Sequence, residues 1–437
     1  MSLRGSLLRG ESAVCVWGLG YVGYSSACFW ASRGVWVVGV EPDSKKAELI
    51  ASGKCPIAGM DVWLAAASVA PAPSIQVFGS SARIPDRLPI SLHCVAVPTE
   101  QNGEPWSDAL LDVTQSIAYR YGKDAIVIIE STVSPAMLDE VKTKCPDLRL
   151  VSAPRRDWFD SPDKHLGTLP RLIGADDAAL LGEVKEALGI VCADLMPVVG
   201  LKKAALVKIV ENDLRHVELM YAQDLARAIG DSYDVREIFS LASSKWNVPL
   251  LRPSIGVGGA CIPLAGRYLK QIADVELSMA AQRSSALHTQ AVVRMLAAHH
   301  RVAFYGIGYK ATVPYVASSP ATWILEQLHE FGFGFGVDAL GVHPTDDAEA
   351  AAIHLRFTRA ALLEAGAFGG ERYCALVIPV GTLGAKKMTE TTFRSVKPYK
   401  MVLDNEGALS HLPVSLWKEI GTRYVVPGQK GWLGSPS

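Results

Sequence analysis

The sequence predicts an α/β protein in which two doubly wound parallel sheets are joined by a long helix and a helical middle segment. Three observations lead to this prediction. Short apolar segments alternate with helical patterns at both ends of the chain, which is typical of parallel sheets. Between them, residues 202–229 contain no Gly or Pro and carry apolar residues at helical spacing. The 437 residues also exceed what one core serves, since domains usually settle at ~100–200 residues.

These patterns divide the chain into three predicted parts. They are an α/β domain at 1–198, a helical domain at 199–298 and a second α/β domain at 299–437. The strands expected in the two α/β domains are 13–17, 35–40, 92–97, 125–129, 301–305, 375–379, 401–404 and 424–426. Prolines and glycines at 249–263 break the helical pattern of the middle part. Alternating Gly and Phe at 332–336 predict a loop or the edge of a sheet.

Composition argues against several classes of protein. The chain has 43 Lys and Arg against 44 Asp and Glu and no basic block, which excludes nucleic acid as the main partner. Hydrophobic residues make up 49% of the chain, which is typical of globular proteins rather than disordered ones. No apolar run reaches the ~18–20 residues of a membrane span. Residues 1–10 lack a sustained apolar stretch, and we expect no secretory signal.

The eight cysteines lie far apart in the sequence. None forms a Cys-x-x-Cys pair, and none lies near a His pair at zinc-binding spacing. In a chain of this length, such spacing indicates reduced thiols in the cytoplasm rather than a disulfide framework or a metal site. We therefore expect no metal, and we expect most of the thiols to be inert core residues.

The first predicted strand runs directly into a Gly-x-Gly-x-x-Gly segment, and a helical pattern follows. Glycines allow a tight turn and close approach to a pyrophosphate, whose charge the helix N-terminus favours. Glu41 ends the next strand, where a carboxylate accepts a ribose hydroxyl and would repel the 2′-phosphate of NADP. The pattern predicts a Rossmann-like domain that binds NAD. The residues expected to contact the cofactor here are Gly18, Gly20, Tyr21, Val22, Gly23 and Glu41.

Polar residues also follow two other strands of the first domain. Pro98 and Thr99 come after the strand at 92–97, and Thr132 belongs to a Glu-Ser-Thr-Val segment after the strand at 125–129. Doubly wound sheets bind ligands at the carboxyl ends of their strands. Such residues are otherwise mostly local caps, and their chemistry alone would not single them out.

Two features of the middle part suggest chemistry. Gly256-Val-Gly-Gly-Ala-Cys261 places a thiol after three glycines, which permit close approach of a substrate to a nucleophile. A buried structural cysteine is the alternative. Lys208 and Asn212 are four residues apart on the long helix and can present an ammonium and an amide to one oxygen. For this pair the alternative is a solvated helix face.

In combination, these segments resemble the UDP-glucose/GDP-mannose dehydrogenase family. The resemblance rests on the order and spacing of five motifs and extends from about residue 13 to residue 430. The motifs are Gly18–Gly23, Glu130–Val133, Ala205–Asn212, Gly256–Pro263 and Gly308–Lys310 with Ser319–Pro320. Ile-Pro after the cysteine is more similar to the branch that acts on UDP-N-acetylhexosamines, such as UDP-N-acetyl-D-mannosamine, than to the UDP-glucose branch.

The resemblance implies a four-electron oxidation of a sugar C6 hydroxyl to a carboxylate with two NAD. Cys261 would form a thiohemiacetal and then a thioester. Lys208 and Asn212 would stabilise the oxyanion, and Thr132 would lie close to the reacting centre. A homodimer through the long helix is also expected. The residues assigned to the UDP-sugar are Arg156, Lys208, Asn212, Arg252, Gly258 and Lys310.

The chain also departs from the family pattern. Arg155 stands where the family commonly has Glu, and Ala265 stands where it has an Asp that orients or activates water. The acidic pair and Arg-Glu expected after Lys310 are absent as well. Three alternatives follow: a binding homologue with impaired catalysis, a dehydrogenase that stops at the aldehyde, and an enzyme for another sugar such as UDP-glucose.

Overall fold

The chain forms two compact units. Unit 1 comprises Met1–Asn212 and Leu264–Asp274, and unit 2 comprises Asp213–Pro263 and Val275–Ser437. The computed structural model describes residues 2–57, 59–70, 73–122, 125–159, 161–259, 261–299, 301–308, 319–330, 334–338, 362–363, 375–381, 383–394 and 398–434. The three-part division made from the sequence remains a prediction.

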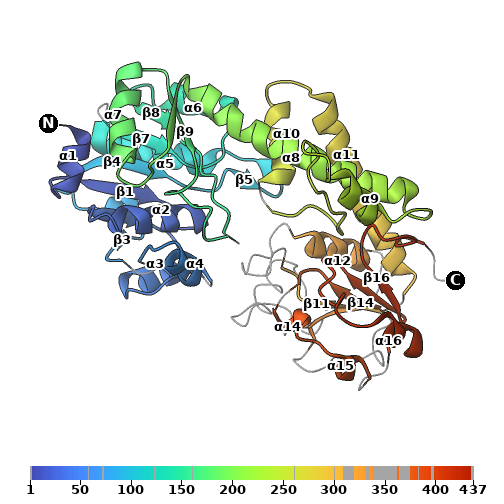
Figure 1. Cartoon of the computed structure of the whole chain (residues 1–437). Coiled ribbons are helices and arrows are strands. Elements are labelled where there is room, and N and C mark those ends of the chain that lie inside the picture. Colours follow the sequence, from blue (N-terminus) through green and yellow to red (C-terminus); the bar gives the residue numbers. More distant parts are fainter. Residues whose placement is uncertain are drawn as a thin grey trace. The chain divides into compact units, whose positions relative to one another are not determined.

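Unit 1 is built on an eight-stranded sheet of order β10-β9-β8-β7-β4-β1-β2-β3 (Figure 1). The six strands from β8 to β3 are parallel, and their order reverses between β1 and β4, as in doubly wound sheets. β9 pairs antiparallel with β8. The strands are β1 (Ala13–Trp17), β2 (Val37–Val40), β3 (Gln76–Phe78), β4 (Ile90–Val95), β7 (Ile126–Ile129), β8 (Arg149–Ser152), β9 (Arg171–Ala175) and β10 (Leu195–Val199), with a hairpin of β5 (Glu100–Gln101) and β6 (Glu104–Pro105).

Helices cover this sheet because both of its faces are apolar. In β1, Val14 and Val16 belong to one core cluster, and Cys15 and Trp17 belong to the cluster on the other face. The helices of this part are α1 (Leu3–Leu8), α2 (Tyr21–Ala31), α3 (Ser44–Ala51), α4 (Met60–Ala66), α5 (Asp108–Tyr121), α6 (Pro135–Lys144) and α7 (Ala178–Leu188), with a 3₁₀ turn at Ser81–Arg83.

The middle of the chain is helical, as the sequence predicts. The long helix expected at 202–229 is confirmed as α8, and three more helices follow it. The four helices of this part are α8 (Leu201–Ile229), α9 (Val235–Ala242), α10 (Ile262–Lys270) and α11 (Glu276–Ala297). The glycine-rich stretch before α10 has no helix or strand among its described residues.

Unit 2 contains a second doubly wound sheet of order β13-β12-β11-β14-β15-β16. All five pairings are parallel, and the order reverses between β11 and β14. The predicted fold class of two Rossmann-like sheets is therefore confirmed. The elements are β11 (Arg301–Tyr305), α12 (Pro320–Glu330), β12 (Gly334–Asp338), β13 (Leu362–Leu363), β14 (Ala375–Ile378), α14 (Leu383–Lys386), α15 (Glu390–Arg394), β15 (Met401–Asp404), α16 (Val414–Glu419) and β16 (Arg423–Val425).

The interpretation of the Gly-Phe alternation as a loop or sheet edge is wrong for its described part. Gly334–Asp338 forms β12, which pairs with β11 on one side and β13 on the other. Pairing on both sides requires extended backbone with free N–H groups, and glycine and phenylalanine both supply these. The composition of the stretch therefore misled the prediction.

None of the described helices combines the length and the apolar character that a membrane span needs. Over the same residues, no group of three or more His, Cys, Asp or Glu side chains is placed to hold a metal ion.

Candidate functional site

The predicted dinucleotide loop of unit 1 has no room for side chains at two of its glycines. Gly18 has a φ of +81°, and a Cβ there would lie 2.7 Å from the carbonyl oxygen of Ala96. A Cβ at Gly23 would lie 1.8 Å from the carbonyl oxygen of Gly18. At Gly20 the space is open, and no side chain caps the N-terminus of α2. The first-turn N–H groups of α2 remain available to an anion, which fits a pyrophosphate.

Glu41 lies beside this loop, as a ribose-binding carboxylate must. It follows β2 and is buried, and its Oε2 accepts a hydrogen bond of 2.9 Å from the N–H of Leu19. Its Oε1 accepts from the N–H of Asp43 at 3.0 Å. These two bonds fix the carboxylate, and each oxygen keeps a lone pair for a ligand hydroxyl. The loop and Glu41 together therefore fit a dinucleotide.

The structure brings together two strand-end segments that the sequence could only suggest. The hydroxyl of Thr99 donates a hydrogen bond of 2.7 Å to the carbonyl oxygen of Thr132. Tyr268 of α10, which sequence reasoning missed, places its buried hydroxyl 2.9 Å from both the carbonyl oxygen and the Oγ1 of Thr99. Next to it, Arg267 forms an ion pair of 2.7 Å with Glu104. α10 is thus tied to the loop after β4.

Removal of the Tyr268 hydroxyl tests this tie. We expect Tyr268→Phe to lower the free energy of unfolding by about 1 kcal/mol, because a buried hydrogen bond is lost without a change of shape. We also expect weaker NAD binding, because Thr99 and Thr132 lose their support. Chemical denaturation and NAD titration measure the two effects. Tyr119→Phe is the control, since Tyr119 is 93% exposed. Equal behaviour of the two variants would contradict the tie.

The predicted polar face of α8 lies in unit 1, where its side chains are partly buried. Lys208 and Asn212 are half-buried, and the buried Nδ2 of Asn212 has no hydrogen-bond partner within the described residues. An unpaired amide donor fits the predicted contact to a ligand oxygen. Arg156 is not free, because its Nε donates to Glu211 of α8 at 3.2 Å and its Nη1 donates to the carbonyl oxygen of Pro170 at 2.9 Å.

In unit 2, Cys261 is exposed and directly precedes α10. The glycines before it are needed for their small size and their backbone angles. A Cβ at Gly256 would lie 2.9 Å from the Cβ of Pro320, and Gly259 has a φ of +91°. The thiol therefore follows a constrained turn and is accessible, as a nucleophile requires. Among the cysteines that the structure describes, Cys261 alone is exposed, and its catalytic role stays a prediction.

The surroundings of Ala265 in unit 1 fit the alanine that stands there in place of the Asp of the family pattern. Ala265 is fully buried in an apolar cluster with Leu264, Tyr268 and Ile209. A carboxylate in these surroundings would lose its hydration, which is costly without a partner. In this chain the position contributes to packing.

A cavity of about 790 Å³ lies in unit 2, beyond the carboxyl ends of β14 and β15. Ligands of doubly wound sheets bind at this edge. Arg252, predicted from the sequence, lines the cavity with Arg236, Lys386, His411 and Glu406. Burial, and then the neighbouring Arg252 guanidinium, lower the pKa of Arg236. Two guanidinium groups in one cavity favour a phosphate-bearing ligand.

Asn405 holds the glycine-rich segment onto the sheet of unit 2. Its Oδ1 accepts from the N–H of Ile255 at 2.7 Å, and its Nδ2 donates to the carbonyl oxygen of Pro379 at 2.8 Å. It lines both the large cavity and a smaller one of about 50 Å³ that includes Gly258. No motif marks Asn405 or Arg236, and only the fold brings them to the cavity. The predicted substrate residue Lys310 lies outside the described residues.

Comparison with protein families gives two matches along the chain. Residues 12–187 match the NAD binding domain of the UDP-glucose/GDP-mannose dehydrogenase family, and residues 202–302 match the central domain of that family. A UDP-N-acetyl-D-mannosamine dehydrogenase of Methanocaldococcus jannaschii is 26% identical over 333 residues, which are 73% of this chain and 77% of that protein. A GDP-mannose 6-dehydrogenase of Pseudomonas syringae pv. syringae is 26% identical over 360 residues, which are 74% and 80% of the two proteins.

Solved structures share the fold over nearly the whole chain. A UDP-D-ManNAc dehydrogenase from Pyrococcus horikoshii superposes with a TM-score of 0.73 at 20% identity, covering 95% of this chain and 99% of that one. A UDP-N-acetyl-mannosamine dehydrogenase from Staphylococcus aureus gives the same TM-score of 0.73 at 19% identity, covering 95% and 98%.

Proposed function

Because this chain belongs to the UDP-glucose/GDP-mannose dehydrogenase family of NAD-dependent nucleotide-sugar oxidoreductases, we propose that it oxidises a UDP-N-acetylhexosamine, such as UDP-N-acetyl-D-mannosamine, to the uronate. The observation that carries this proposal is the exposed thiol of Cys261 after its glycine turn. The Ile-Pro that follows the cysteine and the M. jannaschii relative support the choice of sugar.

Cys261 splits the oxidation of the sugar into two steps. The C6 alcohol first loses a hydride and a proton to become an aldehyde. The thiolate of Cys261 then adds to the aldehyde carbon, and the resulting thiohemiacetal loses a second hydride to become a thioester. Water cleaves the thioester, which frees the carboxylate and the thiol. When bound, NAD would supply the hydride acceptor for both oxidations.

Polar residues of the chain assist these steps. We assign Lys208 and Asn212 to the oxyanion that forms at C6, since an ammonium and an unpaired amide both stabilise negative charge. Thr132 lies in the loop that Thr99 supports and is assigned to the same reacting centre. Arg252 and Arg236, with Lys310 from outside the described residues, are assigned to the substrate diphosphate.

A stoichiometry assay tests the proposed function. Purified protein is incubated with NAD and single UDP-hexoses or UDP-N-acetylhexosamines, and NADH and the sugar product are quantified. We expect two NADH and one uronate per UDP-N-acetylhexosamine. One NADH without uronate would indicate an enzyme that stops at the aldehyde, and turnover of UDP-glucose alone would move the substrate to the other branch.

One alternative has a specific observation in its favour. Ala265 is fully buried where the family pattern has an Asp, and loss of a general base typically costs ~10²–10⁴-fold in rate. A nucleotide-sugar-binding protein with little turnover is therefore the second candidate. In the same assay it would bind the UDP-sugar without forming NADH.

A charge variant tests the substrate cavity. We expect Arg236→Gln to raise the KM for the UDP-sugar about tenfold, because one charge-assisted hydrogen bond to a phosphate is lost. The KM for NAD should stay unchanged, and steady-state kinetics measure both. Arg294→Gln, an exposed arginine of α11, is the control. An equal effect of both substitutions, or a rise in the KM for NAD alone, would remove Arg236 from the substrate site.

We also propose a homodimer through α8. Val210, Leu214 and Tyr221 of this helix are 49%, 59% and 59% exposed, which is high for apolar side chains on a central helix. A cytoplasmic location stays a prediction.

A further inference from the structure

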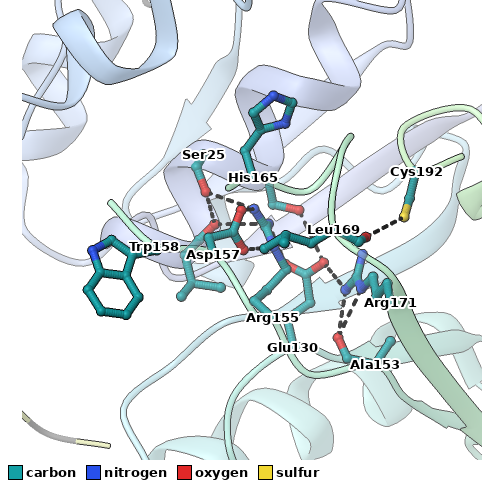
Figure 2. Close-up of polar contacts among 12 residues, drawn as sticks. Ser25, Glu130, Ala153, Arg155, Asp157, Trp158, His165, Leu169, Arg171 and Cys192 are labelled. Atoms are coloured by element: carbon teal, nitrogen blue, oxygen red, sulfur yellow. Dashed lines mark hydrogen bonds and ion pairs between the residues drawn. The ribbon is translucent and has the colours of Figure 1, made fainter. Parts of the chain in front are cut away.

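Four ionisable side chains are buried together in unit 1, near the carboxyl ends of β7 and β8 (Figure 2). Glu130 follows β7, Arg155 and Asp157 follow β8, and Arg171 begins β9. Their side chains are at most 3% exposed. Two positive and two negative charges are thus removed from water at the edge of the sheet where the dinucleotide loop lies.

The four groups are linked to one another by hydrogen bonds and ion pairs, although Oε2 of Glu130 and Nη1 of Arg171 have no hydrogen-bond partner within the described residues. Arg155 donates two hydrogen bonds to Asp157, from Nε to Oδ2 at 2.7 Å and from Nη2 to Oδ1 at 2.8 Å. Its Nη1 lies 3.7 Å from Oε2 of Glu130, whose Oε1 accepts from Arg171 at 2.6 Å. Burial alone would raise the pKa of Asp157, but the Arg155 guanidinium more than offsets this and holds that pKa below its usual value. The buried Arg155 and Asp157 thus form a hydrogen-bonded ion pair.

The same guanidinium reaches the helix that begins in the dinucleotide loop. Nη2 of Arg155 donates to the hydroxyl of Ser25 at 3.1 Å, and Nη1 lies 3.5 Å from the carbonyl oxygen of Val22. The Ser25 hydroxyl in turn donates to this carbonyl oxygen at 2.9 Å. One residue further, Ser26 donates to Glu130 at 3.2 Å. Figure 2 shows Ser25 close to the Arg155–Asp157 pair.

We propose that Arg155 is a positioning residue for the dinucleotide, because it holds the first turns of α2 in register with the strand ends. Val22 belongs to the glycine motif, and the N–H groups of this turn are those that fit the pyrophosphate. A guanidinium binds Asp157 through two parallel bonds and still has a donor for Ser25, whereas the three rotating donors of a lysine cannot hold both in a fixed plane. This role gives a function to the arginine that replaces the acid of the family pattern.

The inference rests on NAD binding by unit 1 and not on the identity of the sugar. A wrong sugar in the proposed function would leave an NAD titration without substrate unchanged. The two proposals can therefore fail independently.

Direct NAD binding to the full-length chain tests the role of Arg155. We expect Arg155→Lys to raise the Kd for NAD about tenfold in calorimetric titration, because charge-assisted bonds are lost. The Kd for UDP should not change. The matched control is Arg149→Lys, since Arg149 lies on β8 and pairs with Glu183 at the surface. If Arg155→Lys leaves the Kd for NAD unchanged, or raises the Kd for NAD and the Kd for UDP equally, the inference is overturned.

A second variant keeps all four charges and covers the case in which Arg155→Lys fails to fold. Ser25→Ala removes only the hydroxyl that receives the Arg155 bond. We expect the Kd for NAD to rise about threefold, with an unfolding midpoint near that of the wild type, because a neutral acceptor contributes less than a charged one. A wild-type Kd for NAD in Ser25→Ala would overturn the proposed link between Arg155 and α2.

Discussion

Replacement of Cys261 by alanine is expected to abolish uronate formation. Without the thiol, neither the thiohemiacetal nor the thioester can form, and the second hydride cannot be removed by the proposed route. We expect the rate of uronate production to fall by at least on the order of 10⁴-fold, as is found when a nucleophile is deleted. Mass spectrometry of the sugar product, together with NADH absorbance, measures this effect.

A second cysteine provides the control for this prediction. Cys55 is a free, half-buried thiol of unit 1 whose Sγ lies 3.3 Å from the carbonyl oxygen of Ile57. Cys55→Ala should retain two NADH per sugar, which separates the role of one thiol from a general effect of thiol loss. Cys261→Ala should still bind NAD and UDP. Uronate formation by Cys261→Ala at the wild-type rate would exclude covalent catalysis by this residue.

The largest effect on stability is expected at Glu130. Its side chain is fully buried, with Arg171 at 2.6 Å and Arg155 at 3.7 Å. Glu130→Ala leaves two buried guanidinium groups with one carboxylate, and an uncompensated buried charge costs ~3–5 kcal/mol. We expect the free energy of unfolding of unit 1 to fall by that amount in urea denaturation followed by Trp fluorescence.

A surface ion pair gives the reference for this measurement. Glu183 pairs with Arg149 at 2.7 Å, and both side chains are 35% exposed. Pairs of this kind contribute roughly 0–1 kcal/mol, because water solvates the separated charges. Glu183→Ala should therefore change the unfolding free energy little. If both variants lose the same stability, the buried cluster does not support unit 1 in the way described.

Much of the fold could be predicted because it depends on local patterns. The strand at Ala13–Trp17 and the helix α8 lie where apolar runs and helical spacing predict them. Gly18 and Gly23 follow from a motif whose spacing reflects backbone clearance, which the structure expresses as distances of 2.7 Å and 1.8 Å. The same approach failed at Gly334–Asp338, because pairing partners far apart in the sequence decide whether such a stretch becomes a strand.

In the candidate site, too, residues marked by local sequence features could be predicted and residues that depend on distant partners could not. Cys261 and Glu41 could be named as candidates from the sequence, because a thiol after three glycines and a carboxylate at the end of a strand are local features. Tyr268, Arg236 and Asn405 belong to no motif, and their hydrogen-bond partners lie 26 to 191 residues away in the chain. Sequence reasoning has no signal for such residues.

Arg155 shows why some residues of the candidate site could be found only in the tertiary structure. The sequence by itself predicts two parallel-sheet domains, an NAD-binding motif and a candidate nucleophile at Cys261, because spacing and residue type are local properties. Only the folded chain decided that Arg155 lies at most 3% exposed between Asp157 and Glu130 and contacts the helix of the NAD motif. The physical reason is that a buried charge depends on neighbours brought together by the sheet, and separations of 2 and 25 residues are equivalent once the chain has folded.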